Sequence, residues 1–268
     1  MFRLPVSGVP VLLQQHTGHE DLLVLEYRAS DTSVALALIS RLVSMPEGMS
    51  MNWTDLTMTD LEALLLCIRR NLFGDLIQAE SRCTASGCGA KVDVSFSIAT
   101  CIESRTIRLP RFLEDTSTPG WYRFRTRTSN GSTATAREDV SFRLPSASDI
   151  AELEQSDRPV RQVLERCLQP SNAPALIRRR IERAMEFMAP LMSQTVEGEC
   201  PECGAALRFF FNVRSFVLQE LRRFAAGVYR EAHLLALHYH WGEDRILALP
   251  SLRRARYVEL IREMGAPA

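Results

Sequence analysis

Apolar residues recur along this 268-residue chain with two different spacings. Steps of three and four residues are typical of amphipathic helices, whereas steps of two are typical of half-buried strands. The first spacing predicts helices over residues 33–43, 59–73, 172–188 and 216–235, with shorter ones after the capping pair Ser146 and Asp149, over 159–168 and on both sides of Pro250. The second predicts strands over residues 9–13, 22–27, 91–98, 121–127, 140–144 and 206–213. The pattern favours an α+β fold that is mainly helical, with short antiparallel strands.

The helix predicted from Thr59 carries the clearest start and stop signals. Thr59 and Glu62 fit a capping box, and Gly74 is placed to end the helix. The leucines at 61, 64, 65 and 66 supply a buried face between these two signals.

The first pair of predicted strands, residues 9–13 and 22–27, indicates an N-terminal hairpin. The polar loop between them holds His16 and His19. Histidines in such loops can bind metal, but a solvated role is the better interpretation for isolated ones.

The second pair, residues 121–127 and 140–144, indicates a long exposed hairpin around Asn130-Gly131. Arginines alternate along its first strand at positions 123, 125 and 127, so Arg123, Arg125 and Arg127 would share one face. A basic ribbon for nucleic acid has this pattern, and so has the polar face of a half-buried strand. We favour the polar face.

Shifts in pattern divide the chain into five regions. They are an N-terminal hairpin and helix (1–50), a first helix-knuckle-strand unit (51–100), a β-hairpin insertion (101–147), helices with a second knuckle-strand unit (148–213) and a C-terminal helical region (214–268). A knuckle is here a tight turn that holds two cysteines.

Two short cysteine motifs carry the strongest chemical signal. Cys83 and Cys88 precede one predicted strand, and Cys200 and Cys203 precede another, roughly 110 residues later. A structural zinc ion takes four soft ligands in a tetrahedron, so the sequence predicts that the two knuckles share one Zn²⁺. Such a site would be closed and structural. It would tie the two halves of the chain together, and replacing Cys83 or Cys200 is expected to unfold the protein.

Two other interpretations of these cysteines are weaker. Free cysteine is often buried as a small apolar residue, but the Cys-Gly endings and the proline after Cys200 suit a tight chelating turn better than a packed core. Disulfides require an oxidising compartment, which nothing in the sequence indicates. Cys67, Cys101 and Cys167 are then expected to be reduced thiols.

Composition and charge narrow the classes of function. Lys plus Arg and Asp plus Glu number 32 each, so no overall field attracts nucleic acid or an acidic surface. The N-terminus has no signal pattern, and no apolar run approaches the roughly 18 residues that a membrane span needs. A cytoplasmic protein with no membrane span is expected.

No catalytic constellation is apparent, so a non-enzymatic protein is expected. Phosphate loops, nucleophile elbows and His-Glu-x-x-His helices are absent from the sequence. His238, His240 and Glu243 could bind a metal ion, as in a metallohydrolase. However, side chains two residues apart point in different directions on a helix. We therefore favour an aromatic plug, that is, aromatic side chains that pack at the end of a helix. The arginines at 178–180 and 183 are interleaved with Glu182 and Glu186 at helical spacing, which favours a solvated or partner-facing surface over a phosphate cradle.

Several of these motifs together resemble the T-even-phage-type baseplate hub assembly protein family. The similarity covers most of the chain from about residue 55 onward. It is carried by the run 59–75 followed by Cys83 and Cys88, by Cys200-Pro-Glu-Cys-Gly-Ala leading into residues 214–221, and by the tail with His238-Tyr-His-Trp241, Ile246-Leu247, Leu249 and Arg253-Arg254. The first knuckle departs from the commoner two-residue spacing, and the central hairpin matches nothing in the family.

The resemblance implies a structural or assembly protein of a contractile phage tail or phage-like contractile injection system. Its expected partners are hub, spike, tube or tape-measure proteins, and its expected place is the cytoplasm during assembly or the finished particle. Nucleic acid is not an expected partner. The main alternative is a zinc-ribbon nucleic-acid-binding protein that uses Arg123, Arg125, Arg127 and the arginines around Arg178.

Overall fold

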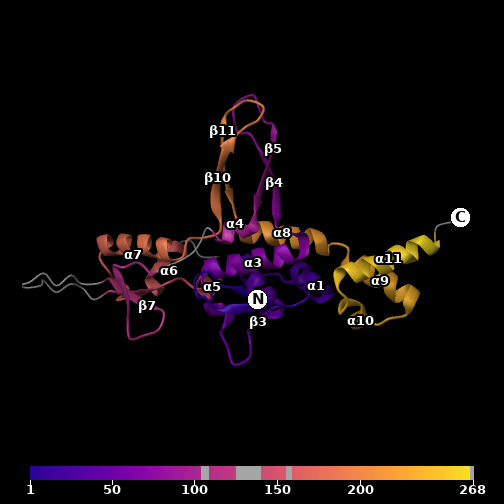
Figure 1. Ribbon diagram of the computed structural model, residues 1–268, viewed down its shortest axis with the longest axis horizontal. Coiled ribbons are helices and arrows are strands. Elements are labelled where there is room, and N and C mark those ends of the chain that lie inside the picture. The colour runs from indigo at the N-terminus through magenta and orange to yellow at the C-terminus, as the bar shows by residue number, and fades with distance from the viewer. Residues whose placement is uncertain (104–108, 125–139, 155–158, 266–268) are drawn as a thin grey trace, which may run out of the picture.

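The chain builds a central helical body, an arm that projects from it, and a smaller lobe on either side (Figure 1). The computed structural model describes residues 1–103, 109–124, 140–154 and 159–265. Helices and short antiparallel strands make up these parts, as the sequence pattern predicted. Among the described residues, no helix has the length and apolar character needed to cross a membrane.

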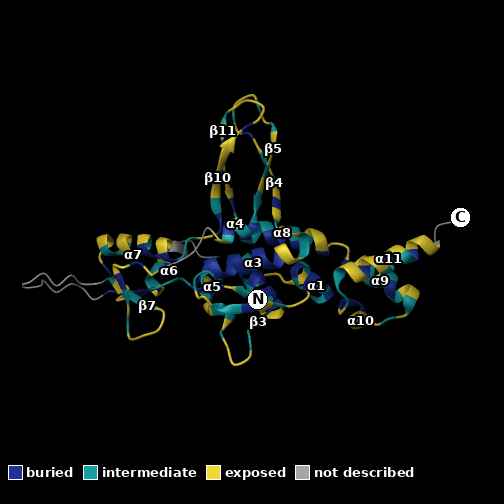
Figure 2. Ribbon diagram, in the orientation of Figure 1, coloured by how far each residue is buried: buried dark blue, intermediate teal, exposed yellow. Residues whose placement is uncertain are grey.

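Helix α3 (Met58–Phe73) forms the centre of the body. Every residue from Met58 to Arg69 is buried, because helices α1 (Gly18–Glu26), α2 (Asp31–Leu42) and α8 (Val213–Ala225) and a small sheet surround it (Figure 2). The sheet has the order β1 (Phe2–Arg3), β2 (Pro10–Leu13) and β3 (Val43–Ser44). A helix buried on all sides needs an apolar run such as residues 63–68, and its buried polar side chains have hydrogen-bond partners elsewhere in the chain.

The start of α3 differs from the prediction. Thr57, not Thr59, is the N-cap, and its hydroxyl accepts a hydrogen bond from the backbone N–H of Asp60 at 3.2 Å. Thr59 and Glu62 instead point into the body and bond to the second half of the chain. The predicted end is confirmed, since Gly74 follows the helix with a φ of 86°.

The N-terminal hairpin prediction is wrong. Residues 22–27 fall mainly in α1, which begins at a capping box formed by Thr17 and Glu20, while β2 pairs with β1 and β3. A short apolar run fits a helix as well as a strand, and here the capping signal before it decides the outcome.

The arm consists of two β-hairpins. Strands β4 (Leu76–Arg82) and β5 (Lys91–Ser97) form the first, and β10 (Gln194–Glu199) and β11 (Ala206–Phe211) form the second. Both hairpins project from the same side of the body (Figure 1). At the base the rings of Phe96 and Phe211 meet edge to face at 4.9 Å. Each knuckle is therefore a strand-knuckle-strand unit, which corrects the predicted helix-knuckle-strand unit.

The lobe on one side contains a four-stranded antiparallel sheet with the order β6-β7-β8-β9. Its strands are β6 (Leu113–Asp115), β7 (Trp121–Phe124), β8 (Ser141–Arg143) and β9 (Leu168–Gln169). Helices α5 (Ala147–Leu153), α6 (Pro159–Arg166) and α7 (Ala175–Met188) complete this lobe, and the hydrophobic core between helices and sheet includes Phe142, which is fully buried. The predicted pairing of the hairpin's two strands is confirmed, since β7 pairs with β8. The prediction that the hairpin is exposed is wrong for its described base, where β7 and β8 are the inner strands of the sheet. Arg125, Arg127 and the Asn130-Gly131 turn lie outside the described residues.

The other lobe holds the C-terminal helices α9 (Val228–Tyr239), α10 (Glu243–Leu247) and α11 (Ser251–Gly265). The single helix predicted over residues 216–235 is two helices, because α8 ends at Ala225 and α9 begins after Gly227. The apolar steps continue across the break, so spacing alone does not reveal it. Two further short helices, η1 (Trp53–Asp55) and α4 (Ile98–Glu103), precede α3 and follow β5.

Candidate metal centre

The four predicted cysteines meet at the far end of the arm. The sulfur atoms of Cys83, Cys88, Cys200 and Cys203 all lie within 4.8 Å of one another. Across the two hairpins, the Sγ atoms of Cys83 and Cys203 are 3.7 Å apart, and those of Cys88 and Cys200 are 3.8 Å apart. The prediction that two distant knuckles come together is confirmed, and the cluster can hold a metal ion.

The turns that carry the cysteines are closed by the backbone. The N–H of Cys83 bonds to the carbonyl of Ala90 at 2.8 Å, and the N–H of Cys200 bonds to that of Ala205 at 2.9 Å. The equivalent glycines Gly89 and Gly204, each directly after a second cysteine, have positive φ angles of 61° and 69°. Only glycine adopts this conformation at little cost, so the Cys-Gly endings have the local reason that the sequence suggested.

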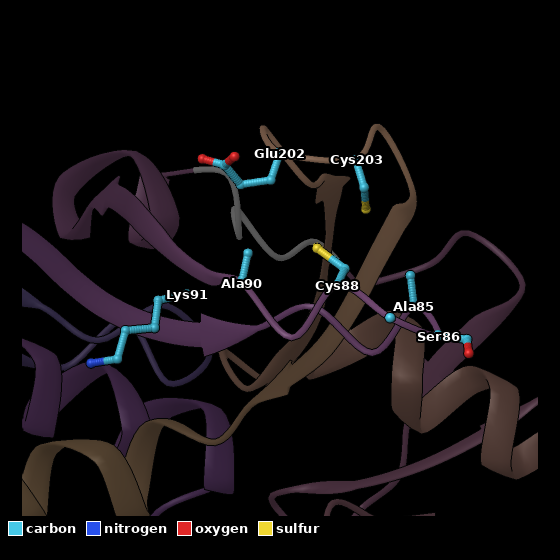
Figure 3. Close-up of a pocket in the computed structure, with 8 residues that line it drawn as sticks. Ala85, Ser86, Cys88, Ala90, Lys91, Glu202 and Cys203 are labelled. Carbon is cyan, nitrogen blue, oxygen red and sulfur yellow. The ribbon is translucent and has the colours of Figure 1, made fainter.

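The cluster has a covered side and an open side. Cys83 and Cys200 are buried at 5% and 2% exposure, and Val92 and Leu207 pack beside them. Cys88 and Cys203 project from the two knuckles into a hollow of about 560 Å³ that is open to solvent (Figure 3). A bound ion would therefore be shielded by the hairpins on one side only.

Among the cluster thiols only Cys200 has a lowered pKa; backbone N–H groups lower the pKa values of Cys83, Cys88 and Cys203, but burial and the neighbouring thiols outweigh them and raise these values. Burial is the largest effect on Cys200 and raises its pKa, but hydrogen bonds from the N–H groups of Cys203 and Glu202 outweigh it and lower the pKa to about 7. In contrast, burial raises the pKa values of Cys67 and Cys167 to about 11, which leaves both inert. All seven cysteines lie in the described residues and none forms a disulfide.

The other metal candidates do not assemble. Among the described residues, the four cysteines are the group of three or more potential ligands that lies close enough to hold an ion. His238, His240 and Glu243 are exposed, and His240 ends α9 with a φ of 54°. Trp241 stacks on Tyr239 at 5.0 Å, which agrees with the aromatic plug that the sequence favoured.

His16 departs from the expected solvated loop residue. It is buried, and its Nε2 lies 2.7 Å from Oδ1 of Asp21. The other oxygen of Asp21 accepts a hydrogen bond from Arg254 in α11, and Arg254 also bonds to Glu231 at 3.0 Å and to the carbonyl of Leu249 at 2.8 Å. This buried network joins the C-terminal lobe to α1. A sequence shows no sign of it, because its members are 233 residues apart.

The arginines of the predicted basic ribbon are only partly described. Arg123 donates to Glu114 on the neighbouring strand at 2.7 Å, so its charge already has a partner. On α7, the guanidinium group of Arg180 lies over the ring of Phe124 at 4.8 Å.

Comparison of the chain with models of protein families, with curated proteins and with solved structures found no match. The function is therefore argued from the site and from the sequence motifs alone.

Proposed function

We propose that the protein is a non-enzymatic structural or assembly protein of the baseplate or hub of a contractile phage tail or phage-like contractile injection system, with a structural zinc ion in its arm. It would act in the cytoplasm during assembly, and retention in the finished particle is compatible with the same role. The structural zinc is supported by the four-thiol cluster between two hairpins, whose facing cysteines are 112 and 120 residues apart.

The geometry of the sulfurs supports zinc as the ion. Zinc–sulfur bonds are about 2.3 Å long, and a regular tetrahedron with this radius places its sulfurs about 3.8 Å apart. The two sulfur–sulfur distances across the hairpins are 3.7 and 3.8 Å, and the other pairs of sulfurs lie within 4.8 Å. Soft thiolates also favour zinc over magnesium, calcium or manganese.

The donor set supports a structural role for the ion. Four thiolates complete a tetrahedral site, which leaves no position for a water molecule or a substrate. The ion would then fix the hairpins to each other at the end far from the body. A rigid projecting arm is useful for contacts with other proteins, since ordering it before binding lowers the entropic cost of association.

The setting in a contractile tail rests on the resemblance of the motifs. The apolar run of α3 ending at Gly74, the two knuckles, and the start of α8 are the parts that carry it. In the described body α8 packs on α3, and the two hairpins that end in the knuckles rise from the same side of that body (Figure 1).

The proposal is tested by co-expression with hub, spike, tube and tape-measure proteins, should genes for them lie beside this one. A stable complex with one of them, recovered by size-exclusion chromatography and visible in assembled particles or assembly intermediates, would support it. Tight binding to DNA with a steep dependence on salt, and none to those proteins, would favour the zinc-ribbon nucleic-acid alternative instead.

A further inference from the structure

Helix α7 has apolar residues on its outer face as well as its inner face. The inner face packs into its lobe through Ile181, Ala184, Met185 and Met188, which are all buried. On the outer side, Leu176 is 74% exposed and Phe187 is 65% exposed. The helix is thus amphipathic in the usual sense, yet its solvent side presents two large apolar side chains at its two ends.

Arginines lie between these two apolar residues. Leu176, Arg180, Arg183 and Phe187 follow one another at steps of four, three and four residues, so they form one line along the helix, which we name the α7 stripe. Arg179 lies beside this line, and all three arginines are exposed.

The arginines of the α7 stripe and Arg179 have no anionic partner among the described residues. Within the part of the chain that the structure describes, neither Arg179 nor Arg183 forms an ion pair, and Arg180 contacts the ring of Phe124 instead of a carboxylate. On the neighbouring helix α6, by contrast, Arg161 pairs with Glu165 at 2.8 Å. The aromatic surface beside Arg180 extends to a second ring, because Phe124 stacks on Phe112, which is 51% exposed.

We propose that the α7 stripe is a docking surface for an acidic segment of a partner protein that carries apolar side chains between its carboxylates. This inference rests on the proposed role in protein assembly and specifies the chemistry of one partner. Carboxylates would complement the arginines, and Arg–carboxylate pairs are the stronger, bidentate kind. Apolar side chains of the same segment would cover Leu176 and Phe187, which an anionic partner without them would leave in water.

Nucleic acid fits the α7 stripe less well. A phosphate backbone would satisfy the arginines, but it would leave Leu176 and Phe187 exposed. An acidic protein segment accounts for both the charge and the apolar ends.

A synthetic peptide tests the surface on the full-length protein. The probe is a fluorescent helical peptide of about four turns, with glutamates and leucines on one face, and its matched control carries lysines in place of the glutamates. Fluorescence anisotropy would report binding to wild type, to R180E/R183E and to Phe187→Ser. The control protein is R253E/R262E, which changes the net charge equally at two exposed arginines of α11.

The expected result is binding of the glutamate peptide, weakened at least about tenfold by R180E/R183E and by Phe187→Ser but unchanged in R253E/R262E. The lysine peptide should not bind. Thermal melts would show that each variant is folded. The proposal is overturned if the glutamate peptide fails to bind, if it binds R180E/R183E as well as wild type, or if an oligothymidylate binds more tightly through the same arginines.

Failure of this inference is separable from failure of the proposed function. If R180E/R183E still forms the complex with tail proteins while peptide binding is absent, the assembly role stands and the α7 stripe is not the docking surface. If no tail protein binds wild type, the assembly role fails whatever the peptide does.

Discussion

Replacing Arg254 with alanine tests how the C-terminal lobe is held to the body. Arg254 is 1% exposed, and its guanidinium group bonds to Asp21, Glu231 and the carbonyl of Leu249. Asp21 is also 1% exposed, so the variant leaves a buried carboxylate without its cation. Removing one partner of a buried ion pair costs about 3–5 kcal/mol, and we expect a loss in this range because His16 and Ser251 alone remain as partners of Asp21.

The loss is measured by urea unfolding followed by circular dichroism and by tryptophan fluorescence, since Trp241 lies in the lobe. The matched control is Arg256→Ala on the same helix, where the pair with Glu259 is exposed and its loss should leave stability almost unchanged. A loss below about 1 kcal/mol for Arg254→Ala would refute the account of this network.

The stability lost in Arg254→Ala should depend on pH, and the pKa of Asp21 gives the direction of that dependence. Burial, the largest effect on Asp21, raises its pKa, but His16 and Arg254 together hold the pKa below its usual value. A carboxylate with a lowered pKa stabilises the folded state above the unfolded pKa of about 4, and that contribution is lost as the pH falls through the folded value. The difference in stability between wild type and Arg254→Ala should therefore narrow in acid and stay constant near neutrality.

Two further substitutions test the capping box and the close packing. Asp149→Asn should cost about 1–3 kcal/mol at neutral pH, because the carboxylate accepts hydrogen bonds from Arg143 at 2.6 and 3.0 Å. Burial, the largest effect on Asp149, raises its pKa, but Arg143 lowers it to about 2 overall, so unfolding at a series of pH values should show this difference fading between about pH 4 and 2. Gly18→Ala should destabilise by about 1–3 kcal/mol, because the new Cβ would lie 2.9 Å from the backbone Cα of Leu247; thermal melts equal to wild type would contradict this packing.

Loss of the metal is expected to affect the folding of the chain less than the sequence indicated. From sequence alone, replacing Cys83 or Cys200 is expected to unfold the chain. In the structure, however, the halves also meet in the body, where Glu62 accepts hydrogen bonds from the N–H and hydroxyl of Ser193 at 2.8 Å each and Arg69 pairs with Glu220 at 2.9 Å. We now expect metal loss to loosen the arm and leave the body folded, which amide hydrogen exchange of β5 and β11 against α3 would show.

The features that the sequence predicted well have signals within a few residues of one another. The end of α3 at Gly74, the Ser146–Asp149 capping box and the course of α7 all follow from local hydrogen bonding and apolar spacing. The cysteine cluster is the exception, since its members are distant. It was predictable because a tetrahedral ion needs four ligands and each knuckle supplies two.

The features that were missed depend on contacts elsewhere in the fold. Strand β4 was missed because Gln78, Glu80 and Arg82 make it look like a polar loop, and only pairing with β5 and the facing hairpin gives it a buried side. The burial of His16 requires α11 to lie beside α1. The break before α9 adds too few residues to disturb the apolar spacing.

Elemental analysis of the purified protein decides whether the four cysteines bind one structural zinc ion. We expect about one zinc per chain in wild type and in His240→Ala, and nearly none in Cys203→Ala, with the helical signal of the body retained in all three. Wild type without stoichiometric metal, or Cys203→Ala with undiminished zinc, would contradict zinc binding by these cysteines.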